Sequence, residues 1–150
     1  MKKIAIILSL VVAYIATSCV KPFEEPNAIA LDNYEVNLPK SVSDTSEPVH
    51  YAHISSNGNW TAKLELADDA TTWCWLQEYY VDAKGNQVNV ATPVSAFEGM
   101  EEEGRWNQVK GSGTVYLPIR FLTASANRYG VLIVTNTDTG DQVIMRITQK

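Results

Sequence analysis

Apolar side chains alternate with polar ones along several short segments of this 150-residue chain. Val115, Leu117 and Ile119 occupy every second position of the clearest segment, residues 115–121. A period of two places such side chains on one face of a β-strand, because successive residues of a strand point to opposite faces. No segment has the 3.6-residue period of an amphipathic helix. The pattern therefore predicts an all-β fold.

The predicted strands are short, and turn residues separate them. They cover residues 34–38, 49–54, 60–66, 73–76, 78–90 (as a hairpin turning at 83–86), 115–121, 131–135 and 143–148. Asn57-Gly58 stands between two of these segments, and Asn-Gly is a strong signal for a tight β-hairpin. About seven short strands with such turns are typical of an immunoglobulin-like β-sandwich.

One stretch breaks this pattern. Residues 91–113 have no periodicity, contain four glycines and include the acidic run Glu101–Glu103. We expect a long loop here, within an insertion that spans residues 78–113. Loops of this length are uncommon in compact domains, and they often carry function.

The first residues have the order of a secretory signal peptide. Lys2 and Lys3 precede the apolar run 4–15, and three small residues then precede Cys19. This order matches a charged region, an apolar region and a cleavage zone. The apolar run is shorter than the roughly 20 residues that a membrane-spanning helix needs. We therefore expect residues 1–18 to be a signal peptide.

The small residues before Cys19 resemble the lipobox of bacterial lipoproteins, although Ala16 stands where leucine is usual. The resemblance implies that Cys19 is acylated and anchors the chain, since two or more acyl chains hold a protein stably on a bilayer. Residues 19–30, which include two prolines, then form the lipidated cysteine and a tether, and residues 31–150 form the domain. The alternative is a plain signal peptide followed by an incidental cysteine.

The charge of the chain argues against nucleic acid as a partner. Loss of Lys2 and Lys3 leaves 10 basic and 17 acidic side chains, a formal charge of −7. A protein that binds a phosphate backbone needs a cluster of basic side chains, and the sequence contains none.

Cys74 is the other cysteine of the chain. If Cys19 is lipidated, Cys74 has no intramolecular partner, so no disulfide is expected. Its position between Trp73 and Trp75 favours a small apolar side chain in a packed strand over a reactive thiol.

Catalytic and metal-binding motifs are not evident in the sequence. His50 and His53 are three positions apart on a predicted strand, so their side chains point to opposite faces. The acidic pair at 68–69 and the acidic run at 101–103 are typical of solvated surface. No Gly-x-Ser-x-Gly nucleophile motif is present. We expect no enzyme activity, no metal and no cofactor.

Five stretches together resemble a known family. They are 55–62 (Ser-Ser-Asn-Gly-Asn-Trp-Thr-Ala), Trp75-Leu76, Gly111-Ser112-Gly113, 127–134 (Asn-Arg-Tyr-Gly-Val-Leu-Ile-Val) and 144–149 (Ile-Met-Arg-Ile-Thr-Gln). Their order and spacing resemble the BACON domain family of Bacteroidetes proteins, over about residues 30–150. The resemblance implies an immunoglobulin-like sandwich that binds carbohydrate or mucin, or that serves as a spacer. The stretch 78–113 is longer than in the family, so no family property is carried into it.

Aromatic residues are the remaining candidates for ligand contacts. Sugars present apolar C–H faces that stack on exposed rings, while polar neighbours bind the hydroxyls. Trp106 lies in the expected loop beside amide side chains, and Tyr79, Tyr80 and Trp73 are further candidates. We expect Trp75 to lie in the core. The alternative for Trp106 is a ring that folds back to cap the sandwich.

These observations predict a non-catalytic, lipid-anchored outer-membrane protein, at the cell surface, that binds a glycan. The acidic pair Glu24-Glu25 resembles the surface-export signals of Bacteroidetes lipoproteins, and the alternative is a solvated linker with two incidental charges. The alternative function is a structural or interaction subunit, or a spacer, of an outer-membrane assembly with a protein partner.

Overall fold

The computed structural model of the chain describes residues 29–41, 48–67, 72–90, 95–96, 104–123 and 125–150. These residues form strands and turns and no helix, which confirms the all-β fold. The strands are β2 (Ile29–Leu31), β3 (Glu35–Asn37), β4 (Val49–Ser56), β5 (Asn59–Leu66), β6 (Cys74–Leu76), β7 (Tyr79–Asp82), β8 (Gln87–Asn89), β9 (Ser95–Ala96), β10 (Trp106–Ser112), β11 (Val115–Phe121), β12 (Arg128–Asn136) and β13 (Gln142–Gln149).

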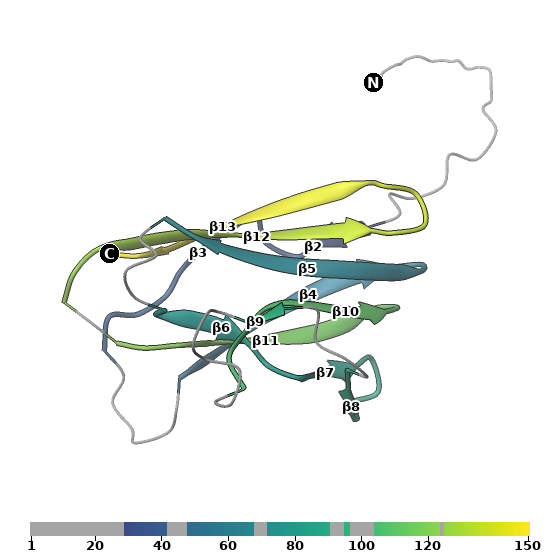
Figure 1. Cartoon of the computed structure of the whole chain (residues 1–150), viewed down its shortest axis with the longest axis horizontal. Coiled ribbons are helices and arrows are strands. Elements are labelled where there is room, and N and C mark those ends of the chain that lie inside the picture. Colours follow the sequence, from purple (N-terminus) through teal and green to yellow (C-terminus); the bar gives the residue numbers. More distant parts are fainter. Residues whose placement is uncertain (1–28, 42–47, 68–71, 91–94, 97–103, 124) are drawn as a thin grey trace, which may run out of the picture.

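Hydrogen bonds join the strands into one curled sheet. The order is β2-β4-β11-β6-β10-β5-β12-β13-β3, and β7, β8 and β9 are attached beside this path. The sheet curls so that β5, β12 and β13 form an upper layer and β4, β6 and β11 form a lower layer (Figure 1). Strand β10 pairs with both β5 and β6, so it joins the two layers. The fold is therefore sandwich-like, although its two layers belong to one hydrogen-bonded sheet.

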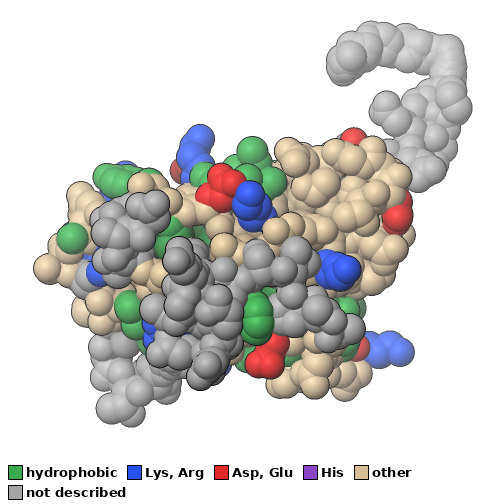
Figure 2. All heavy atoms as spheres, in the orientation of Figure 1, with side chains coloured by type: hydrophobic (Ala, Val, Ile, Leu, Met, Phe, Trp, Pro, Cys, Tyr) green, Lys and Arg blue, Asp and Glu red, His purple; other side chains and the backbone are tan. Residues whose placement is uncertain are grey.

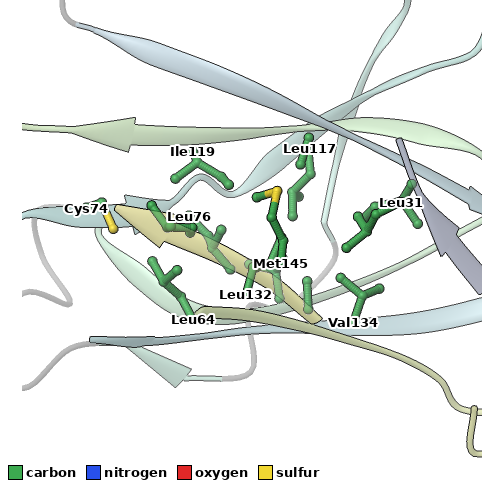
Figure 3. Close-up of a cluster of buried hydrophobic side chains, with 14 of the residues drawn as sticks. Leu31, Leu64, Cys74, Leu76, Leu117, Ile119, Leu132, Val134 and Met145 are labelled. Atoms are coloured by element: carbon green, nitrogen blue, oxygen red, sulfur yellow. The ribbon is translucent and has the colours of Figure 1, made fainter. Parts of the chain in front are cut away.

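The core lies between the two layers. Leu64, Leu132 and Met145 extend from the upper layer toward Leu76 and Ile119 of the lower layer (Figure 3). All five side chains are at most 2% exposed. Each comes from the alternate positions of its strand, so burial of one face of the curled sheet accounts for the two-residue period of the sequence.

The C-terminal strands follow the sequence prediction closely. β12 and β13 pair in antiparallel register from Arg128↔Gln149 to Thr135↔Gln142. The turn between them contains Gly140, whose φ of 83° lies in the left-handed region. The predicted hairpin at 78–90 is also confirmed, because β7 pairs with β8.

The Asn57-Gly58 turn does not form the hairpin that its sequence predicts. β4 pairs with β2 and β11, whereas β5 pairs with β10 and β12. The turn therefore carries the chain from the lower layer to the upper layer. Ser56 Oγ donates to Gly58 O (3.0 Å), and Asn136 Nδ2 donates to Asn57 Oδ1 (3.4 Å). These contacts to its own backbone and to the end of β12 hold the turn as a connection between layers.

The expectation of a loop over all of residues 91–113 is wrong. Residues Trp106–Ser112 form β10, which pairs with β5 from Gln108↔Lys63 to Ser112↔Asn59. The sequence pattern did not indicate this strand because Gly111, at one of its inward positions, has no side chain. The alternation of apolar and polar residues is therefore nearly lost. A segment expected to leave the domain is instead the strand that joins its two layers.

The N-terminal boundary also differs from the prediction. β2 begins at Ile29, inside the segment 19–30 expected to be a tether. Ile29 is 1% exposed and pairs with Ser56 of β4, so burial and sheet hydrogen bonds recruit it to the domain. The predicted signal peptide, Cys19 and the acidic residues at 24–25, 68–69 and 101–103 lie outside the described residues. None of the described residues belongs to a helix with the length and hydropathy of a membrane span.

Candidate ligand-binding groove

An open groove of about 870 Å³ lies between the β5–β10 pair and the β7–β8 hairpin. Its lining consists of two aromatic residues, six residues with amide or hydroxyl side chains, one lysine, one valine and one glycine. The lining residues are Asn59, Trp60, Thr61, Tyr80, Asn89, Val90, Gln108, Lys110, Gly111, Ser112 and Thr137.

Strand alternation explains the polar wall of the groove. Val109 is buried in the core, so its neighbours Gln108 and Lys110 point to the opposite face of β10. Lys110 lies opposite Thr61, and Ser112 lies opposite Asn59, in the register of β10 with β5. Paired residues of antiparallel strands share a face, so these side chains form one polar ladder.

The aromatic part of the groove depends on Gly111. A Cβ atom at this position would lie 2.5 Å from Trp60 Cζ2 and 2.8 Å from Tyr80 Cε2. The missing side chain therefore leaves room for both rings, which meet edge to face with centroids 5.6 Å apart. Trp60 is fully buried, and its indole N–H donates to Gly113 O (3.0 Å). Tyr80 is half-buried and rests on this fixed ring.

The β7–β8 hairpin holds the opposite wall. Its β7 strand pairs with β11, and Val90 N donates to Glu78 O (2.8 Å) at its base. At its tip, Asp82 Oδ1 accepts from the backbone N–H groups of Lys84 and Asn86. The hydrogen bond from Asn86 is the main cause that lowers the pKa of Asp82. Strand β8, which ends at Asn89, therefore follows a turn that these hydrogen bonds close.

Only one of the four aromatic candidates from the sequence, Tyr80, lines the groove. Trp73 is 0% exposed and belongs to the core, so it has no free ring face for a ligand, and its selection is wrong. Trp106 begins β10 and packs half-buried against the core, and it is not in a loop. Tyr79 is half-buried on β7 and lies outside the groove lining.

A strand over residues 73–76 would place Trp73 and Trp75 on one face, but they do not share one. Trp73 precedes β6 and enters the core, together with Cys74 and Leu76. Trp75 is buried outside that core cluster, where the Arg105 guanidinium lies 4.1 Å from its ring centroid. The two-residue period fails here because Trp73 lies before the start of the strand.

The other chemistry-bearing side chains are dispersed. Cys74 is buried, and burial raises the pKa of its thiol far above the ordinary range, so the thiolate does not form near neutral pH. The packed, unreactive environment predicted for Cys74 is therefore observed. His53 stacks on Tyr116 at the surface, whereas burial lowers the pKa of His50. No three His, Cys, Asp or Glu side chains of the described residues are placed to hold a metal ion.

Charged side chains are scattered over the described part of the face in Figure 2, with acidic and basic groups interspersed. The one charged side chain of the groove lining is Lys110. The groove thus has a hydrogen-bonding lining with two aromatic rings and one basic side chain.

A comparison of the chain with protein-family models and with curated proteins gives no match.

Most of the groove residues were not singled out from the sequence. Asn59, Asn89 and Gln108 are ordinary polar residues of predicted strands or of the expected loop. One signal was present, because Gln108, Lys110 and Ser112 alternate with Val109 and Gly111. Such an alternation is that of a strand with one polar face.

Proposed function

We propose that the chain is a cell-envelope lipoprotein, anchored through Cys19, whose immunoglobulin-like, BACON-like domain binds carbohydrate at the bacterial surface without catalysis. The observation that carries the proposal is the groove between β5, β10 and the β7–β8 hairpin. Its lining includes the ring of Tyr80 together with residues that carry amide and hydroxyl side chains.

A sugar ring needs both kinds of contact. Its C–H face stacks on an aromatic ring, and its hydroxyl groups bond to amides and hydroxyls that fix its orientation. Asn89 of β8 and Gln108 of β10 both belong to the groove lining. Each amide both donates and accepts, which suits a ligand whose hydroxyl groups do the same.

The test is a glycan array probed with the full chain in mild detergent, beside an Asn89→Ala/Gln108→Ala variant. We expect binding to at least one glycan, weakened about thirtyfold in the double variant, since each of the two lost hydrogen bonds is worth about 1 kcal/mol. Gln87→Ala is the matched control, because Gln87 is exposed on the same strand as Asn89 but lies outside the groove. A blank array from protein that unfolds cooperatively would refute the proposal.

A second candidate function is a non-catalytic structural or interaction subunit of an outer-membrane assembly. It is favoured by β3, which ends the sheet order and has exposed Glu35 and Asn37. An edge strand of this kind can receive a strand from another protein. A partner that co-purifies with the chain and is lost on Glu35→Pro would support this function, because Tyr34 and Leu38 bond to β13 and the N–H group of Glu35 therefore lies on the free side of β3.

A further inference from the structure

Three aromatic rings lie together on the outer face of the lower layer. Tyr116 pairs with His53 in the register of β11 with β4, and their rings stack with centroids 4.5 Å apart and planes 25° apart. Tyr51 lies two residues before His53 on β4, so it shares the same face. Tyr51 is 44% exposed and Tyr116 is 41% exposed. We call these three residues the ring platform.

The ring platform faces away from the core. Ala52 and Ile54, which alternate with its residues on β4, are 0% exposed in the core. The stacking of His53 on Tyr116 also restricts both rings before any ligand arrives. A ligand therefore meets a surface that is already ordered, which lowers the entropy lost on binding.

The ring platform and the groove lie on either side of the β7–β8 hairpin. Tyr116 pairs with Val81 of β7, so Val81 lies on the platform side of the hairpin. Its neighbour Tyr80 points to the other side and lines the groove. Strand β8 pairs with β7 alone among the described strands, and the hairpin extends from the lower layer (Figure 1). One flexible chain that passes around β8 would contact both surfaces.

We propose that the ring platform is a second sugar-stacking surface, and that the domain binds a long glycan chain at the groove and the platform together. This inference rests on the proposed carbohydrate function. Phenol and imidazole rings combine an apolar face with a polar edge, as a pyranose ring does with its C–H face and hydroxyl groups.

The composition of the exposed surface favours a sugar over an apolar protein segment. The large exposed apolar side chains of the described residues are four tyrosines and Ile144. Ile144 lies on β13 in the upper layer, so among the described residues no large exposed aliphatic side chain joins the ring platform. A polysaccharide needs flat rings with polar edges, which the ring platform supplies.

Two contact surfaces on one domain predict that affinity depends on ligand length. Once one sugar occupies the groove, the platform meets the rest of the same chain at a high effective concentration. We expect a polymer to bind at least about tenfold more tightly than its own trisaccharide, a modest part of the gain that two linked contacts can provide.

The experiment measures the affinity of the full chain in mild detergent for β-glucan, xylan, mannan and galactan, each as polymer and as trisaccharide. It compares the wild type with a Tyr51→Ala/Tyr116→Ala variant and with a Tyr34→Ala/Tyr129→Ala control, which removes two exposed tyrosines elsewhere. Equal urea midpoints among the three proteins show that the fold is intact. We expect the platform variant alone to lose the preference for polymer, with its trisaccharide affinity unchanged.

The outcomes separate this inference from the proposed function. Tighter polymer binding that survives in the platform variant would overturn the inference and leave the groove as the binding site. Equal binding of polymer and trisaccharide by the wild type would do the same. Absence of all glycan binding overturns both. Self-association of the wild type that disappears in the platform variant would overturn the inference by assigning the rings to a second copy of the chain.

Discussion

The β12–β13 hairpin and the stretch from Glu78 to Ser112 both build the sheet, but the sequence encodes them differently. β12 and β13 are long, and their register extends from Arg128↔Gln149 to Thr135↔Gln142. The other stretch contributes β7, β8 and β9, of two to four residues each, and β10. Its strands pair with β5, β6 and β11, which lie elsewhere in the sequence.

The two regions differ in which strands supply their apolar contacts. In β12, Leu132 and Val134 fill their own core positions. In β10, the space above Gly111 is filled by Trp60 of β5 and Tyr80 of β7. The first arrangement allows the strand to be predicted from its own residues. The second arrangement hides the strand from the sequence pattern, and it places the half-buried ring of Tyr80 in the lining of the groove.

The largest effect on stability is expected in the β12–β13 hairpin. Leu132→Ala removes a fully buried side chain from the core, so we expect the free energy of unfolding to fall by about 2–5 kcal/mol. Ile144→Ala, at an exposed position of β13, should change it by less than about 0.5 kcal/mol. Urea unfolding measures both. Similar losses for the two variants would contradict the assignment of the core face.

Gly111→Ala tests the second region of the comparison, the stretch from Glu78 to Ser112. The new methyl group would collide with Trp60 and Tyr80, and we expect a loss of about 1–3 kcal/mol in the free energy of unfolding from overpacking. Because the rings must shift, glycan binding at the groove should weaken as well. Ser112→Ala, at the exposed next position, is the control for stability. An unchanged unfolding midpoint for Gly111→Ala would show that the rings can move aside freely.

The two hairpin tips give a matched comparison. Gly140 and Gly85 have φ values of 83° and 89°, and nothing lies within 4 Å of a Cβ built at either. Alanine should therefore introduce only backbone strain, of about 1–2 kcal/mol. We expect Gly140→Ala to lower global stability, and Gly85→Ala to act on local opening, because β8 pairs only with β7 among the described strands.

Hydrogen exchange distinguishes these two responses. In Gly85→Ala, amides of β7 and β8 should exchange faster while those of β12 keep their wild-type rates. Faster exchange across the whole sheet in this variant would mean that the hairpin is as tightly coupled to the core as β12–β13.

The smallest expected effect is a change of stability with pH. It arises in the lower layer, at His50 of β4, since the β12–β13 hairpin has no histidine. Burial lowers the pKa of His50 from its ordinary value of 6.5, and Asp32 opposes this shift. The unfolded chain therefore binds the proton more readily, so stability falls as the pH drops below about 6.5. His50→Gln should show a smaller fall in urea midpoint than the wild type between about pH 7.5 and pH 5.5. Parallel curves would exclude a contribution from His50.

Much of the sheet could be predicted, and the groove could not. Strands β11, β12 and β13 were identified because each carries its own apolar positions. The Asn57-Gly58 turn was misread, since local turn chemistry does not specify whether the chain returns to the same layer or crosses to the other. Tyr80 was selected for its residue type, but Trp73 was selected for the same reason and is buried in the core. Residue type alone does not distinguish a ring in the core from a ring at the surface.

The sequence by itself determined the all-β class and the position of the longest strands, because a two-residue period is a local property of each segment. Only the tertiary structure decided that Trp106–Ser112 is a strand and that Tyr80, Gln108 and Asn89 line one groove. The same is true of the stacking of Tyr116 on His53 beside Tyr51. These contacts join residues far apart in the chain, and the pairing of strands into a curled sheet, which no single segment specifies, brings them together.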